Sequence, residues 1–196
     1  MMSKAERTKS FIIEKTAPIF NTKGFAGTSL NDMTAATGLT KGSIYGNFAN
    51  KDEVALAVFD FNLQKLKMAT SRAIARETGA RAKLLAYAGC YEGTLFPPFT
   101  TGGCPILNTA VESDDTHPAL REKAANALIS WKNSIVELIN EGKATKEFSA
   151  AINAEQFALT MVATVEGAIM ISRTLGDIQI LQTIVQSLKR TIEELK

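Results

Sequence analysis

Apolar residues recur at spacings of three and four through most of the chain, a pattern that predicts helices rather than strands. Glycine, proline and short polar runs separate these stretches. We therefore expect helices over about 6–20, 50–76, 80–96, 104–112, 118–141 and 153–175, and a last one from 178. A turn is expected over 21–25, and Pro18 is expected to kink the first helix near its end. The pattern predicts an all-α fold.

Residues 28–48 predict two short helices with a glycine between them. The apolar residues of the first helix share one face, and Gly38 can adopt the left-handed conformation that a tight turn between helices requires. Thr28 and Thr40 each stand just before a helical segment. A hydroxyl there can accept from backbone N–H groups or donate to a DNA phosphate.

The second short helix presents polar side chains suited to DNA. Lys41 can donate to guanine or phosphate, and Asn47 can pair with adenine. Ser43 and Tyr45 are of types that commonly reach phosphates. This arrangement is typical of a helix-turn-helix whose second helix enters the major groove. Two helices joined at a glycine are also a common packing corner, and these residues alone leave that alternative open.

The flanking segments strengthen the DNA-binding interpretation through a resemblance. The runs that carry it are FNTKGF at 20–25, TSL at 28–30, ATGLTKGSIYGNF at 36–48 and NKDE at 50–53. Together they closely resemble the DNA-binding domain of tetracycline-repressor (TetR) family regulators over residues 6–56. The resemblance implies an N-terminal three-helix DNA-binding domain at 1–50 and a larger helical effector-binding and dimerisation domain at 51–196.

The resemblance also implies which residues contact DNA. Thr28 matches the phosphate-contacting start of the second helix, and Lys51 matches a phosphate-binding lysine that opens the fourth. Asn47 replaces a frequent histidine, which puts the base preference, but not the fold, in doubt. The DNA-contacting residues that we expect are Thr28, Ser29, Thr40, Lys41, Gly42, Ser43, Tyr45, Asn47 and Lys51.

The last two helices carry apolar seams at spacings of three and four. They resemble half of the four-helix bundle that joins the family's homodimers, and two-fold symmetry would double the base contacts on a palindromic operator. An ordinary core stripe within one chain is the alternative. The expected interface residues are Phe157, Val165, Ile169, Ile178, Leu181, Val185, Leu188 and Ile192.

Aromatic and sulfur-containing residues in the middle helices could line a cavity for a small apolar or amphipathic effector, oriented by Glu92, Asn108 or Glu166. The same residues could equally form plain core. The candidates are Tyr87, Tyr91, Phe96, Phe99, Cys104, Leu107, Trp131, Phe157 and Met161. Cys104 precedes a helix, where a lowered thiol pKa would allow redox or electrophile sensing, and a small buried residue is the alternative.

Composition fits a soluble regulator in the cytoplasm. The 196 residues are 45% hydrophobic and carry a net charge of +2, yet residues 1–51 hold a surplus of four positive charges. This surplus favours phosphate, although lysines that are merely solvated would give it too. No secretion signal is recognised. The apolar run 157–171 is interrupted by Glu166 and is expected to be too short to span a membrane.

The chain shows no sequence sign of catalysis. It lacks a P-loop, a GxSxG element and a dinucleotide fingerprint, and its two cysteines and single histidine offer no metal-ligand pattern. We expect no catalytic residue, metal or cofactor. The expected function is a one-component repressor that binds a palindromic operator in double-stranded DNA as a homodimer and is released by a small molecule. An activator, or a regulator that senses through Cys104, stays open on the same fold.

Overall fold

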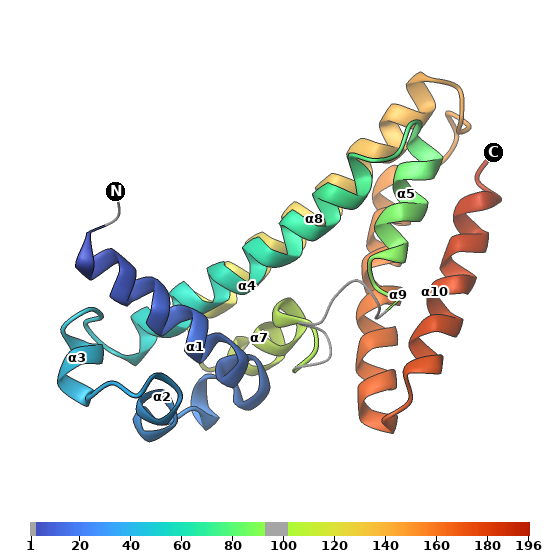
Figure 1. Cartoon of the computed structure of the whole chain (residues 1–196). Coiled ribbons are helices and arrows are strands. Elements are labelled where there is room, and N and C mark those ends of the chain that lie inside the picture. Colours follow the sequence, from blue (N-terminus) through green and yellow to red (C-terminus); the bar gives the residue numbers. More distant parts are fainter. Residues whose placement is uncertain (1–2, 93–101) are drawn as a thin grey trace. The chain divides into compact units, whose positions relative to one another are not determined.

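The computed structural model describes residues 3–92 and 102–196, and in those residues the chain is helical throughout its regular structure (Figure 1). The predicted all-α fold, with an N-terminal helix-turn-helix and a helical C-terminal part, is confirmed. The helices are α1 (Lys4–Gly27), α2 (Leu30–Thr37), α3 (Lys41–Tyr45), α4 (Lys51–Ile74), α5 (Ala80–Gly89), α7 (Pro105–Ser113), α8 (Pro118–Ala144), α9 (Ala154–Leu175) and α10 (Ile178–Glu193).

Side-chain caps fix several helix starts where the sequence predicts them. The Glu53 N–H donates to Asn50 Oδ1 at 2.9 Å before α4, and the Gln156 N–H donates to Asn153 Oδ1 at 3.0 Å before α9. Gly38 ends α2 in the left-handed region, with φ 68° and ψ 8°. The helix-turn-helix therefore has the predicted glycine corner.

The first helix differs from the prediction. The segment 21–23 continues α1 instead of forming a turn, and the break comes at Gly24, where φ is 72° and ψ is −178°. Pro18 lies inside α1 with helical backbone angles, and the expected kink at that residue stays a prediction. A single exposed proline removes one backbone hydrogen bond, and the helix continues past it.

The described chain packs as two compact units. Unit 1 contains residues 3–65 and 102–125, and unit 2 contains residues 66–92 and 126–196. The segment 102–125, with α7 and the first turns of α8, thus packs with the N-terminal helices. These are units of packing, and the functional division into 1–50 and 51–196 stays a prediction.

Each unit has its own apolar core. In unit 1 the core is formed by helices α1, α2, α3, α4 and α8. Its buried members include Ile12, Phe20, Met33, Ile44, Phe48, Val54, Val58 and Leu120. In unit 2, α10 packs against both α9 and α5. The buried residues there include Leu84, Ile135, Ile139, Met161, Val165, Leu181, Val185 and Ile192.

Helix α9 is more apolar than the sequence argument allowed. By length and composition alone its 22 residues could cross a membrane, so the expectation that this stretch is too short is wrong. A buried core helix passes the same test, and 44% of the apolar window of α9 is buried in the fold. Helix α10 packs against it.

Candidate functional site

Helix α2, the first helix of the helix-turn-helix, begins with a reciprocal cap. Ser29 Oγ accepts from the Asp32 N–H at 3.1 Å, and Asp32 Oδ2 accepts from the Ser29 N–H at 2.8 Å. The hydrogen bond from Lys23 holds the pKa of the Asp32 carboxyl far below its usual range, and the bonds from Ser29 lower it further. Ser29 itself is exposed at the start of α2.

Thr28 does not lie where the sequence predicts. It caps the end of α1 rather than the start of α2, and it is 0% exposed. Its hydroxyl donates to the Gly24 carbonyl at 2.6 Å. Because that hydroxyl is buried and already bonded, the structure gives no support to the predicted phosphate contact by its side chain.

Helix α3 is short and is anchored by one apolar residue. Ile44 is 0% exposed, while Thr40, Lys41 and Gly42 are exposed at the first turn. Thr40 Oγ1 accepts from the Ser43 N–H at 3.2 Å, which caps the helix. This geometry presents the N-terminal turn of α3 outward, as a recognition helix requires.

The other predicted residues of α3 are less free. Ser43, Tyr45 and Asn47 are half-buried. Asn47 Nδ2 donates to the Ser43 carbonyl at 2.8 Å, which occupies a donor that bidentate pairing with adenine would use. Asn47 is therefore a weaker candidate for base reading than Lys41.

Lys51 opens α4 beside an aromatic cluster. Its Nζ lies 4.4 Å from the centre of the Phe25 ring, and Phe25 packs edge-on against His117 with ring centres 4.6 Å apart. His117 Nε2 is 3.0 Å from Asp52 Oδ1, while its Nδ1 accepts from the Leu120 N–H at 3.2 Å. The cluster holds the ammonium group of Lys51 near the start of α4.

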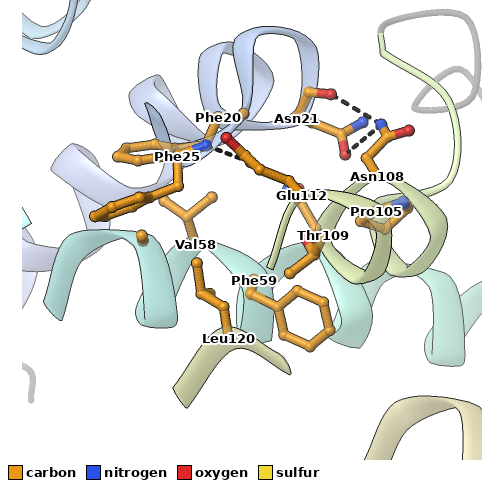
Figure 2. Close-up of a pocket in the computed structure, with 13 residues that line it drawn as sticks. Phe20, Asn21, Phe25, Val58, Phe59, Pro105, Asn108, Thr109, Glu112 and Leu120 are labelled. Atoms are coloured by element: carbon orange, nitrogen blue, oxygen red, sulfur yellow. Dashed lines mark hydrogen bonds between the residues drawn. The ribbon is translucent and has the colours of Figure 1, made fainter. Parts of the chain in front are cut away.

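A small cavity lies among α1, α4 and α7 within unit 1, and Figure 2 shows its lining. Its volume is about 30 Å³, which is room for one or two water molecules. Ligand sites generally need several hundred Å³. Phe20, Val58 and Leu120 form the apolar part of the lining, and Asn108 and Glu112 supply polar groups. The cavity is too small for an effector.

The predicted effector residues are divided between the two units. Cys104 and Leu107 belong to unit 1, whereas Tyr87, Tyr91, Trp131, Phe157 and Met161 belong to unit 2. Phe96 and Phe99 lie outside the described residues.

In unit 2, Tyr87, Tyr91 and Trp131 form an aromatic cluster. The rings of Tyr91 and Trp131 stack with centres 5.3 Å apart, and Tyr87 lies 6.3 Å from Tyr91. Burial raises the pKa of the Tyr87 hydroxyl. The indole N–H of Trp131 is buried and has no hydrogen-bond acceptor among the described residues. Such a donor is available to a polar group that enters the cluster.

Two of the three polar residues expected to orient an effector make other contacts in the structure. Glu92 forms an ion pair with Lys189 at 2.6 Å. Asn108 Nδ2 donates to the carbonyl oxygens of Asn21 at 2.9 Å and of Gly102 at 2.6 Å. Glu166 is 9% exposed on α9. The first two are therefore structural contacts.

Neither cysteine presents an exposed thiol. Cys104 is 0% exposed, and burial raises the pKa of the Cys90 thiol to about 11. These observations favour the packing role for both residues over thiol sensing. In residues 3–92 and 102–196, no three His, Cys, Asp or Glu side chains gather as metal ligands would.

Much of the predicted dimer seam is buried within one chain, and its role as an interface stays a prediction. Residues that pack fully on their own chain leave little surface for a partner. Six of the eight expected interface residues are buried there, at 0–6% exposure: Val165, Ile169, Leu181, Val185, Leu188 and Ile192. Phe157 is half-buried, and Ile178 is 49% exposed.

A second stripe lies beside the buried one. A groove of about 410 Å³ runs between α9 and α10, and small hydroxyl residues form much of its wall. On α9 the stripe recurs at spacings of three and four, through Phe157, Thr160, Thr164, Gly167 and Ile171. On α10 the groove is lined by Ile184, Ser187, Leu188 and Thr191.

Comparisons with known proteins agree across both parts of the chain. The model described as bacterial regulatory proteins, tetR family, matches residues 12–58, and the model described as tetracyclin repressor-like, C-terminal domain, matches residues 80–188.

Solved structures resemble the whole chain. A TetR-family transcriptional regulator from Cytophaga hutchinsonii is 45% identical, with a TM-score of 0.94 over 100% of this chain and 98% of that one. A TetR transcriptional regulator from Chloroflexus aurantiacus J-10-FL is 36% identical, with a TM-score of 0.93 over 99% and 98%. The HTH-type transcriptional repressor DhaR of Mycobacterium sp. (strain GP1) is 23% identical over 83% of this chain and 80% of its own length.

Proposed function

The chain belongs to the tetracycline-repressor family of DNA-binding transcriptional regulators, which are not enzymes, and from that premise we propose that it is a one-component repressor. It binds a palindromic operator as a homodimer in the cytoplasm, and a small-molecule effector releases it. The observation that carries the proposal is the outward first turn of α3, with exposed Lys41 above fully buried Ile44.

Charge supports the DNA-binding role. Unit 1 contains the N-terminal segment that carries the surplus of positive charge, and release of counterions from phosphate favours binding there. The proposed DNA-contacting residues are Ser29, Thr40, Lys41, Gly42, Ser43, Tyr45 and Lys51. Thr28 is left out because its hydroxyl is buried, and Asn47 is given a secondary role.

Operator binding is tested by selecting bound duplexes from a random pool with the purified protein. We expect a palindromic sequence whose affinity falls steeply with salt. Selection of no sequence at all would contradict the proposal. Selection of a motif without two-fold symmetry would contradict its dimeric part.

The second stripe of α9 and α10 supports a homodimer through the groove that it borders. Small residues allow a partner helix to approach closely, and a Cβ added at Gly167 would meet no atom within 4 Å in one chain. Thr160 Oγ1 donates to the Gln156 carbonyl at 2.8 Å and Thr191 Oγ1 to the Ser187 carbonyl at 3.2 Å, so these hydroxyls can be buried by a partner at little cost. A second copy of the chain is the occupant that we propose.

The substitution Thr164→Arg tests this surface. It places a charge in the groove, where a close helix–helix contact leaves no room for it, and we expect a monomer by light scattering after size exclusion. Gln182→Arg adds the same charge at an exposed α10 residue that does not line the groove and should leave the dimer intact. If Thr164→Arg remains a dimer, the interface does not include this groove.

The aromatic cluster of unit 2 supports an effector that combines a flat apolar part with a hydrogen-bond acceptor. Tyr91 and Trp131 offer stacking surfaces, and the indole N–H of Trp131 offers the donor. Because the chain has one tryptophan, its fluorescence reports on this cluster alone. Compounds that change this fluorescence should also weaken operator binding. A compound that releases DNA without changing it would place the effector elsewhere.

A further inference from the structure

The break in α1 is held open by side chains from α7. In an unbroken helix the N–H of Phe25 would donate to the carbonyl of Asn21, four residues earlier. Here the Phe25 N–H donates to Glu112 Oε2 at 2.7 Å, and the Asn21 carbonyl accepts from Asn108 Nδ2 at 2.9 Å (Figure 2). Two bonds from α7 thus replace one lost bond of α1.

Both oxygens of Glu112 are engaged in this contact. The Ala26 N–H donates to Glu112 Oε1 at 2.8 Å, beside the bond from Phe25. A carboxylate that accepts from adjacent N–H groups makes stronger bonds than a neutral acceptor does. Asn108 and Glu112 are four residues apart, so they reach α1 from one face of α7.

Gly24 is the residue that this arrangement requires. Its φ of 72° lies in the left-handed region, and a Cβ at this position would overlap the carboxylate of Glu112. Any other residue would therefore meet backbone strain and would displace the Glu112 carboxylate from its bonds to α1. The break and the contact with α7 depend on the same glycine.

The break leads directly into the helix-turn-helix. The Gly24 carbonyl accepts from the Thr28 hydroxyl at 2.6 Å, and α2 begins after Ser29. The direction in which the chain leaves α1 therefore sets the direction of α2. Helix α3 follows α2 after the turn at Gly38.

We infer that Glu112 and Asn108 are positioning residues for operator recognition, because they hold α1 broken at Gly24 and thereby aim α2 and α3. Neither residue is among those that we propose to contact DNA. The inference rests on the proposed operator binding. It adds the residues that set the orientation of α2 and α3.

The preference of the protein for one half-site spacing is a suitable readout, because a loss of stability alone would not change it. Glu112→Ala and Asn108→Ala are compared with the natural protein on the selected palindrome and on versions whose half-sites are one or two base pairs closer or farther apart. Each protein is assayed well below its thermal midpoint. We expect Glu112→Ala to lose at least about tenfold in affinity at the preferred spacing and to discriminate less among spacings.

The control is Glu122→Ala, which removes the same charge from an exposed position of α8 in the same unit. It should keep the natural affinity and spacing preference. Glu112→Gln retains one acceptor oxygen and should fall between the natural protein and Glu112→Ala. A folded Glu112→Ala protein with unchanged affinity and spacing preference would overturn the inference.

A second measurement needs no DNA. Backbone chemical shifts of residues 21–27 distinguish a broken from a continuous helix, and we expect Glu112→Ala/Asn108→Ala to show a continuous one. Gly24→Ala should do the same, and adding Glu112→Ala to it should cause little further loss of affinity, because both changes undo one contact. If the break at Gly24 persists in Glu112→Ala/Asn108→Ala, then these two side chains do not hold it, and the inference is overturned. Failure of the natural protein to select a palindrome would instead overturn the operator proposal, and with it the DNA-aiming role.

Discussion

At the scale of single residues, different side chains of α3 anchor the helix and face the proposed DNA. Ile44 has no exposed surface and fixes the short helix to unit 1, while Lys41 stands in solvent at the first turn. Because α3 has only five residues, one buried anchor carries much of its placement. Substitutions at the two positions should therefore have separable effects on folding and on binding.

Lys41→Ala should weaken operator binding about tenfold and reduce the slope of log affinity against log salt by about one, because it removes a positive charge from the DNA-facing turn. Its thermal midpoint should stay within the error of the natural protein, since the side chain is exposed. Binding is measured by fluorescence anisotropy at several salt concentrations. Arg76→Ala, an exposed cation of unit 2, is the control, and an equal loss in that variant would contradict the assignment.

The sequence predicts the corner residues well but misplaces one cap. Thr28 and Ser29 are adjacent hydroxyl residues, and either could start α2. Ser29 does so because Asp32, three residues later, returns a bond to its backbone. Thr28 turns inward because the break at Gly24 offers it a carbonyl. The first reason is visible in the sequence, whereas the second requires the fold.

At the scale of helices, carboxylates at helix starts share one electrostatic property. The Ala49 N–H lowers the pKa of Glu53, and the N–H groups of Arg81 and Ala80 lower that of Glu147 at the start of α5. Asp32 is shifted in the same direction, chiefly by Lys23. Each carboxylate is stabilised as an anion by the partially positive end of a helix or by a cation.

This shared property predicts acid destabilisation. A folded-state pKa below the unfolded value means that the stabilisation is complete above about pH 4 to 5 and is lost as the pH falls through the folded-state pKa. Thermal midpoints measured from pH 7 to pH 3 should fall over that range, modestly for each group because all three are exposed to solvent screening. Asp32→Asn should flatten the dependence, whereas Glu122→Gln should not. A midpoint that is independent of pH would contradict the prediction.

The stripe of α10 yields a second prediction at this scale. Leu188 is 6% exposed within one chain, so Leu188→Ala should lower the free energy of unfolding by about 2–5 kcal/mol through lost burial and a new cavity. Urea denaturation measures this loss, with exposed Gln182→Ala as control. A variant of normal stability would show that the stripe is not core.

The sequence could not decide between core and interface for that stripe. Spacings of three and four predict an apolar helix face correctly, but they do not say what covers it. The interface that we propose instead contains Thr160, Thr164 and Ser187, whose hydroxyls look like solvent-facing residues in the sequence. Glu112 was likewise not singled out, because its bonding partners lie 86 and 87 positions earlier in the chain.

At the scale of the whole molecule, unit 1 is assembled from two separate stretches of chain. Phe20, Val58 and Phe59 share a cavity lining with Pro105 and Leu120, so the first stretch alone lacks part of its apolar cover.

A fragment of residues 1–65 should therefore melt at least about 15 °C below the intact protein, or lose its cooperative transition. Circular dichroism during heating measures this. Adding a peptide of residues 102–125 should restore part of the helix signal, and the same peptide with Glu112→Ala should restore less. A fragment as stable as the intact protein would contradict the assignment of 102–125 to this unit.

The distance along the chain between the two stretches has a consequence for synthesis. A ribosome that adds about 5–20 residues per second makes residues 66–125 only after several more seconds, and until then α1 has no Glu112 to hold its break open. A nascent or prematurely terminated chain therefore contains α3 but lacks the Glu112 contact that orients it. Unfinished molecules would not compete with complete ones for their genes.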